Sequence, residues 1–186
     1  MFDDSTLRLL SNWEPISSFG EEDCHAAVMT FVAAINQHLD LRAFVGDHTY
    51  NNYVPVYVYA LADLTRYVQT KEEVCTNYPC LLLYFHYFTP VAALGNSSWS
   101  ETLGPNGACV SRGYGALDIP DLLNFNQIQS TLMQARIRAA MAKTPYAIES
   151  PDFFGKLAPD GFEPIERSEG VPPWNRIFHL FFQFND

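Results

Sequence analysis

Residues 80–88 read CLLLYFHYF and form the densest apolar run of the chain. The run has the length of one β-strand and is far shorter than the roughly 18 apolar residues that indicate a membrane-spanning helix. Apolar side chains fall on both faces of such a strand, which is typical of a strand at the centre of a covered sheet. The sequence therefore predicts a central strand at 80–88.

The C-terminal segment 177–184, IFHLFFQF, is a second apolar run. Alternation gives it one wholly apolar face, which includes Phe182, so we expect a strand that is buried in the core. Each of the two runs holds one histidine, His86 in the first and His179 in the second. Both are expected to be neutral structural residues, with a role as catalytic acid or base as the alternative.

Two segments have the three-and-four spacing of apolar residues that indicates an amphipathic helix. The first is 21–39, which follows a capping-box pattern that begins at Ser18 and has acidic residues in its first turn. The second is 120–143, which follows the expected N-cap Asp118 and ends before Pro145. We expect each helix to pack one face against the core.

Residues 53–69, YVPVYVYALADLTRYVQ, fit two different structures. Valine and tyrosine alternate from 53 to 59 as in a strand, whereas apolar residues from 57 to 68 keep helical spacing. Pro55 argues against a central strand and is tolerated in the first turn of a helix. We therefore favour a helix here, and a strand is the alternative.

The glycine-rich stretch 95–115 is expected to be the longest irregular segment, with a short strand near 108–111. Few helices and non-sequential strands favour an α+β fold over alternating βα units. A chain of 186 residues fits one domain. We therefore predict a single domain over residues 1–186, in which a mixed or antiparallel sheet packs against two or three helices.

The chain is acidic, with 21 Asp and Glu against 11 Lys and Arg and a formal net charge of −10. This excess repels phosphate backbones and disfavours nucleic-acid binding. It favours a basic protein partner, although solubility alone also explains it. Residues 1–10 lack the basic and apolar regions of a signal peptide, and no stretch is apolar enough to span a membrane. We therefore expect a cytoplasmic protein.

The sequence contains no local pattern of a metal or nucleophile site, such as CxxC, HExxH or GxSxG. We therefore expect no metal, no cofactor and no catalytic residue. The four cysteines have no framework spacing and are expected to be reduced thiols. Cys24 is expected to be inert, and Cys80 and Cys109 to be small buried side chains.

One acidic segment near the C-terminus, GFEPIERSEGVPPW (161–174), has no structural explanation in a helix or a helix N-terminus. Prolines stiffen it and an aromatic residue closes it, a combination that suits a protein-binding surface. A solvated loop is the alternative. The predicted partner-binding residues are Asp160, Glu163, Glu166, Glu169 and Trp174.

In its general profile, which is small, acidic, leaderless and rich in aromatic residues, the chain resembles the immunity proteins that bacteria pair with antibacterial toxins. No motif carries this resemblance. It implies a non-catalytic protein that binds a cognate toxin and occludes or distorts its active site, and the charge favours a basic toxin. The alternatives are a chaperone or adaptor for a secreted protein, and a small enzyme whose site uses His86, His179 and the stretch 95–115.

Overall fold

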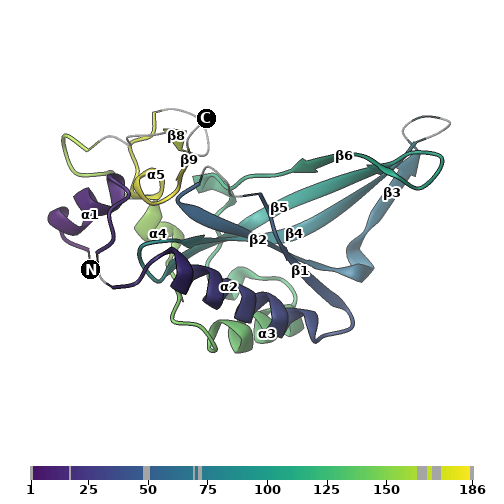
Figure 1. Ribbon diagram of the computed structural model, residues 1–186, viewed down its shortest axis with the longest axis horizontal. Helices are drawn as coiled ribbons and strands as arrows, with labels where there is room; N and C mark the ends of the chain where they lie inside the picture. The colour runs from purple at the N-terminus through teal and green to yellow at the C-terminus, as the bar shows by residue number, and fades with distance from the viewer. Residues whose placement is uncertain are drawn as a thin grey trace.

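The computed structural model describes residues 2–16, 18–47, 51–68, 70, 73–162, 167–168 and 173–184. Within them a seven-stranded sheet is the central element (Figure 1). Neighbouring strands follow the order β1-β2-β4-β5-β6. β3 pairs with the N-terminal part of β4, and β7 lies parallel to the start of β5. The strands are β1 (Leu41–Val45), β2 (Tyr53–Ala60), β3 (Thr65–Val68), β4 (Val74–His86), β5 (Val91–Leu103), β6 (Cys109–Tyr114) and β7 (Ala147–Ile148).

Helices cover both faces of the sheet, and the predicted α+β class is confirmed (Figure 1). One apolar core lies between the sheet and two helices, α2 (Glu21–Asn36) and α3 (Thr131–Met141). A second core lies on the opposite face, under α1 (Asp4–Ser11), α4 (Pro151–Phe154) and α5 (Ile177–Phe181). A separate two-stranded pair joins β8 (Arg167–Ser168) to β9 (Gln183–Phe184).

The strand predicted at 80–88 is confirmed by β4, which begins earlier than predicted, at Val74. β2 and β3 pair with one edge of β4 and β5 pairs with the other, so β4 is central. Its alternate residues enter different cores: Leu83 packs beneath α2 and α3, whereas Leu82 packs beneath α5. Burial on both sides explains the unbroken apolar run.

The helix predicted at 53–69 is wrong, because β2, a 3-10 turn at 61–63 and β3 occupy the segment. Pro55 is tolerated in β2 because its nitrogen faces β1 just beyond the end of the β1–β2 ladder. Its carbonyl accepts the Gly46 N–H at 2.8 Å on that same side. The N–H and carbonyl of one residue point to the same neighbour in an antiparallel sheet, so the missing N–H costs no bond to β4.

The helix predicted at 21–39 is confirmed by α2, which ends at Asn36. Its N-cap is Gly20 rather than Ser18: the Gly20 N–H donates to the Asp23 carboxylate at 3.0 Å. That carboxylate therefore satisfies a backbone group and lies at the positive end of the helix dipole.

Only the second half of the helix predicted at 120–143 is helical. α3 begins after Ser130, whose hydroxyl accepts a backbone N–H of the first turn at 3.2 Å. Two 3-10 turns precede it, at 119–121 and 125–127, and Asp118 caps the first of them with a 2.6 Å hydrogen bond. The apolar residues of these turns are spaced as in an α-helix, which explains why the sequence predicted one continuous helix.

The strand predicted at 177–184 is wrong in conformation, although its burial is as expected. Most of the segment is the helix α5, and only β9 is extended. All residues from 177 to 183 are buried. A helix that is apolar on every side is buried on every side. In a run this short, the spacing of apolar residues does not distinguish a helix from a strand.

The stretch 95–115 is mostly strand, contrary to the irregular loop that we predicted. β5 continues without a break to Leu103, and a turn at 104–108 joins it to β6. Gly107 has a φ of +76° in this turn, a conformation that glycine adopts without strain.

The sheet is strongly curled. β1 and β6 lie at opposite ends of the strand order and would be about 19 Å apart in a flat sheet. The ring centroid of Phe44 on β1 nevertheless lies 5.0 Å from that of Trp99 on β5 and 6.2 Å from that of Tyr114 on β6. The Tyr57 hydroxyl on β2 donates to the carbonyl of Gly115, just after β6, at 2.8 Å. We call the region where β1 and β2 approach the end of β6 the seam.

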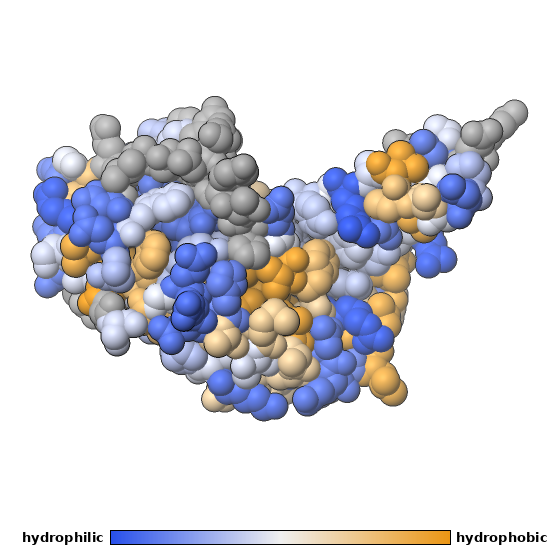
Figure 2. All heavy atoms as spheres, viewed as in Figure 1, coloured by the Kyte–Doolittle hydropathy of each residue, from blue (hydrophilic) through white to orange (hydrophobic). Residues whose placement is uncertain are grey.

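β3, β6 and the adjoining halves of β4 and β5 project from the body as an arm (Figure 1). Every residue of β3 and β6 is exposed. Apolar side chains at the arm remain in solvent, namely Tyr67, Val68, Val74, Val110 and Tyr114. Figure 2 shows apolar surface near the end of the arm and a hollow between the arm and the body.

Gly95→Ala is expected to lower the free energy of unfolding by about 1–3 kcal/mol. A Cβ at this position would lie 2.6 Å from the backbone carbonyl oxygen of Asp121 and 2.7 Å from the Leu117 side chain. The segment after β6 would have to move away from the sheet. Urea denaturation would measure the resulting loss in the free energy of unfolding. Gly113→Ala is the control, because its nearest neighbour is the Ser100 hydroxyl, a group that can rotate away. Equal losses in the two variants would contradict this packing.

Candidate functional site

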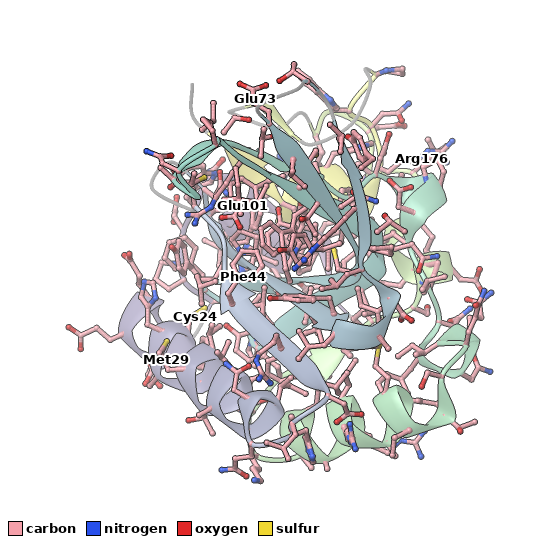
Figure 3. The ribbon with its side chains drawn as sticks, turned by 90° about the vertical axis from the view of Figure 1, so that its right-hand side faces the viewer. Cys24, Met29, Phe44, Glu73, Glu101 and Arg176 are labelled. Carbon is pink, nitrogen blue, oxygen red and sulfur yellow. The ribbon has the colours of Figure 1, made fainter. Side chains whose placement is uncertain are left out.

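The concave face of the curled sheet carries six aromatic side chains beyond the region that α5 covers. We call them the aromatic cluster: Phe44, Tyr57, Tyr59, Tyr78, Trp99 and Tyr114. Figure 3 looks onto this end of the molecule and shows side chains crowding the space inside the curl around the labelled Phe44. Phe44 stacks on Tyr57 with ring centroids 5.1 Å apart and meets Trp99 edge-on. Five strands therefore contribute to one continuous ring assembly.

The stacked pair of Tyr78 and Trp99 is the tightest contact of the aromatic cluster, with ring centroids 3.8 Å apart and planes 7° from parallel. Trp99 is only 8% exposed, and its indole N–H is buried without a hydrogen-bond acceptor. An unsatisfied buried donor is costly. Burial is the main cause that raises the pKa of the neighbouring Tyr59, which therefore stays neutral.

Two arginines near the aromatic cluster are engaged by groups of the chain itself. Arg112 donates two hydrogen bonds to one carboxylate oxygen of Glu101, at 2.9 and 3.0 Å. Arg42 donates to the carbonyls of Leu41 at 2.6 Å and of His38 at 3.1 Å, beyond the C-terminal end of α2. Their positive charge is thus largely compensated on this face.

A small cavity of about 180 Å³ opens at the seam, beside the aromatic cluster. We call it the tyrosine cavity, because Tyr53, Tyr57, Tyr84 and Tyr114 line it together with Asp47 and Asn51. The first three tyrosines are buried, whereas Tyr114 is 45% exposed and Asp47 is exposed.

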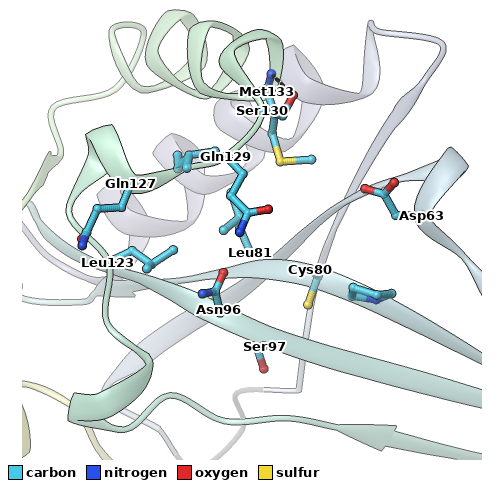
Figure 4. A pocket seen from close by; sticks show the side chains of 12 residues that line it. Asp63, Cys80, Leu81, Asn96, Ser97, Leu123, Gln127, Gln129, Ser130 and Met133 are labelled. Atoms are coloured by element: carbon cyan, nitrogen blue, oxygen red, sulfur yellow. Dashed lines mark hydrogen bonds between the residues drawn. The ribbon is translucent and has the colours of Figure 1, made fainter.

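A larger pocket of about 680 Å³ lies on the other face of the sheet, near the start of α3 (Figure 4). Amide and hydroxyl side chains from the second 3-10 turn, the segment before α3 and β5 line it together with apolar residues, and Asp63 is at one side. Cys80 also lines it, but burial raises the pKa of this thiol to about 12 and keeps it protonated. Neither His86 nor His179 is among the lining residues.

Most of the predicted partner-binding surface lies outside the described residues, namely Glu163, Glu166 and Glu169. Asp160 is exposed and Trp174 is half-buried. The chain segments that lead to these two residues run side by side, because the Ala158 N–H donates to the Asn175 carbonyl at 2.8 Å and Leu157 forms a bridge with Arg176.

His86 is fully buried, and burial lowers its pKa to about 3. Its Nδ1 accepts the Phe88 N–H at 3.1 Å, and its Nε2 lies 3.5 Å from the Asn52 amide nitrogen. The Asn52 side chain in turn accepts the Gln183 N–H at 2.9 Å. The histidine therefore lies beside an asparagine that binds the C-terminal segment.

His179 is buried beneath the first 3-10 turn after β6. Its Nδ1 accepts the Arg176 N–H at 3.2 Å, and its Nε2 lies 3.9 Å from the Asp118 carboxylate, beyond hydrogen-bond distance. Burial lowers the pKa of this ring, and the negative charge of Asp118 offsets part of that effect.

The cysteines differ in their environments. Cys24 is buried, and burial raises the pKa of its thiol to about 12, as expected of an inert side chain. Cys80 is buried as predicted, but Cys109 is exposed on β6, so its predicted burial is wrong. Among the described residues no His, Cys, Asp or Glu side chains gather into a group that could hold a metal ion.

Sequence reasoning missed the aromatic cluster and the tyrosine cavity. Their residues come from β1, β2, β4, β5 and β6, and only the curl brings them together. The alternation of tyrosine on β2 was a usable signal, because it places Tyr53, Tyr57 and Tyr59 on one face of a strand.

No protein-family model, curated protein or solved structure matches the chain. In the part of the chain that the structure describes, no helix has both the length and the apolar character to cross a membrane.

Proposed function

We propose that this chain is a non-catalytic cytoplasmic protein that binds a basic bacterial toxin and inhibits it by covering its active site. The observation that carries the proposal is the aromatic cluster, whose rings come from five strands and include the exposed Tyr114 on the arm. Tyrosine and tryptophan are the residues that most often dominate the binding energy of protein interfaces.

Shape and charge support the same proposal. The hollow between the arm and the body is a concave surface of the kind into which part of a partner can enter (Figure 2). The net charge of −10 raises the encounter rate with a cationic protein. Asp160 and Trp174 lie on neighbouring chain segments. We include them in the proposal as a second part of the interface, with Glu163, Glu166 and Glu169 as its further acidic members.

The proposal is tested by affinity capture followed by a toxicity assay. The immobilised chain should capture a basic protein at low salt and release it as salt is added, because the Debye length falls from about 10 Å at 0.1 M to about 3 Å at 1 M. The captured protein should arrest the growth of bacteria that produce it alone and should not do so when the chain is produced with it. Growth arrest in both cases would contradict inhibition.

Tyr78→Ala is expected to weaken binding of that captured protein about tenfold or more, measured by calorimetry, because it removes one face of the stack with Trp99. Tyr67→Ala is the matched control, since Tyr67 lies on the arm outside the aromatic cluster and is 55% exposed. Equal weakening by both changes would place the interface elsewhere. A partner that disappears from cells lacking the chain, but keeps its activity when bound, would instead indicate a chaperone.

A further inference from the structure

The tyrosine cavity has a size that decides what class of group it can hold. Pockets for whole small molecules usually measure about 300–1,000 Å³. At about 180 Å³ the tyrosine cavity is smaller than this range, so it suits one side chain better than a metabolite. It opens at the seam, next to the aromatic cluster that forms the proposed interface.

The walls of the tyrosine cavity are electron-rich. The ring centroids of Tyr53 and Tyr84 lie 4.2 Å apart, and those of Tyr57 and Tyr114 lie 5.7 Å apart. The faces of aromatic rings attract cations within about 6 Å of the ring centroid, and more strongly where water is excluded. Such walls favour an ammonium or guanidinium group over an anion.

The mouth of the tyrosine cavity adds a negative charge. Asp47 follows β1, is exposed and lines the opening, and Asn51 places a side-chain amide beside it. Neither Arg42 nor Arg112 lines the cavity, and both are engaged elsewhere. A cation that enters therefore meets a carboxylate first and tyrosine side chains behind it.

Two close contacts hold the walls in place. The Tyr57 hydroxyl donates to the Gly115 carbonyl at 2.8 Å, and the Leu117 N–H donates to the Tyr84 hydroxyl at 2.9 Å. These bonds join β2 and β4 to the segment after β6. Because the walls are already ordered, the protein loses less conformational entropy when a ligand binds.

We propose that the tyrosine cavity receives one lysine or arginine side chain of the basic partner and so anchors the complex. This inference rests on the proposed function, because it assigns the anchor of that same interface. An acidic side chain would be repelled by the Asp47 carboxylate.

The test uses the full chain with short oligolysine, oligoarginine and oligoglutamate peptides as probes, followed by titration calorimetry and NMR of the tyrosine rings. Asp47→Asn and Tyr114→Ala should each weaken binding of the preferred cationic peptide about fivefold or more. Asp152→Asn is the matched charge control, because Asp152 is an exposed carboxylate on α4. Tyr67→Ala is the aromatic control, and circular dichroism verifies that each variant is folded.

Equal weakening in Asp152→Asn and Asp47→Asn would overturn the inference, because attraction would then depend on net charge alone. Tighter binding of oligoglutamate, or no binding of any peptide, would also overturn it. Toxin inhibition that survives both Asp47→Asn and Tyr114→Ala would remove the anchor but keep the proposed function. Selective peptide binding at the tyrosine cavity without inhibition of any captured toxin would keep the cation-binding cavity but contradict the proposed function.

Discussion

Phe182→Ala is expected to lower the free energy of unfolding by about 3–5 kcal/mol. The Phe182 side chain has no exposed surface, and it follows α5 at the point where the chain turns into β9. Its ring packs against Phe178 at 5.0 Å and against Tyr84 and Phe154 at 5.5 Å between centroids. Truncation would leave a cavity at the contact between α5 and the sheet, one that rigid neighbouring rings cannot fill.

Urea denaturation of Phe182→Ala measures this loss, and Leu39→Ala is the control. Leu39 is a large apolar residue that is 89% exposed, so its truncation should change stability by less than about 0.5 kcal/mol. If Phe182→Ala proved as mild as Leu39→Ala, the C-terminal segment would not pack on the sheet as the structure has it. An unchanged dependence on urea concentration would show that unfolding remains two-state.

The sequence predicted best the long elements, in which many consecutive residues show the same pattern of burial. β4 and α2 are of this kind, because many residues in a row report the same environment. The segment 177–184 is too short for its period to be read, and only its burial could be foreseen. In 53–69 the rarity of proline in central strands favoured a helix. Pro55 is tolerated because it lies beyond the end of the β1–β2 ladder, and only the folded sheet shows where that ladder ends.

The polar strand β5 could have been found from its turn. Pro105, Asn106 and Gly107 separate two extended segments, which is a hairpin signal. The candidate site could not be foreseen in the same way. Phe44 and Tyr114 are distant in the chain and in the strand order, and their contact depends on the curl of the whole sheet.

Acid is expected to destabilise the fold through His86. Burial lowers the pKa of its imidazole to about 3, against 6.5 in an unfolded chain. Between these two values the unfolded chain binds a proton that the folded chain does not, so stability falls as the pH falls from about 6.5 to about 3. The loss is about 2 kcal/mol between pH 7 and pH 5, and on the order of 4 kcal/mol over the whole window.

The structural cause is burial of the His86 ring, and its hydrogen bond adds a second cost of protonation. Nδ1 accepts the Phe88 N–H, so protonation at Nδ1 would both charge a buried ring and break this bond. Measuring between pH 7 and pH 5 separates the effect from Asp3 and Asp40, whose lowered pKa values reduce stability only in more acidic solution, near and below pH 4. His179, whose pKa burial also lowers, acts in the same window and with the same sign, and its contribution remains in His86→Gln.

Two variants isolate the histidine. His86→Gln should be less stable than the wild-type protein at pH 7, and its free energy of unfolding should fall much less between pH 7 and pH 5. Leu82→Ala removes a side chain of similar burial while keeping the histidine, so it should lose stability at pH 7 and retain the wild-type pH dependence. A wild-type slope in His86→Gln would show that other groups cause the acid sensitivity. A reduced slope in Leu82→Ala would show that lower stability alone flattens the curve.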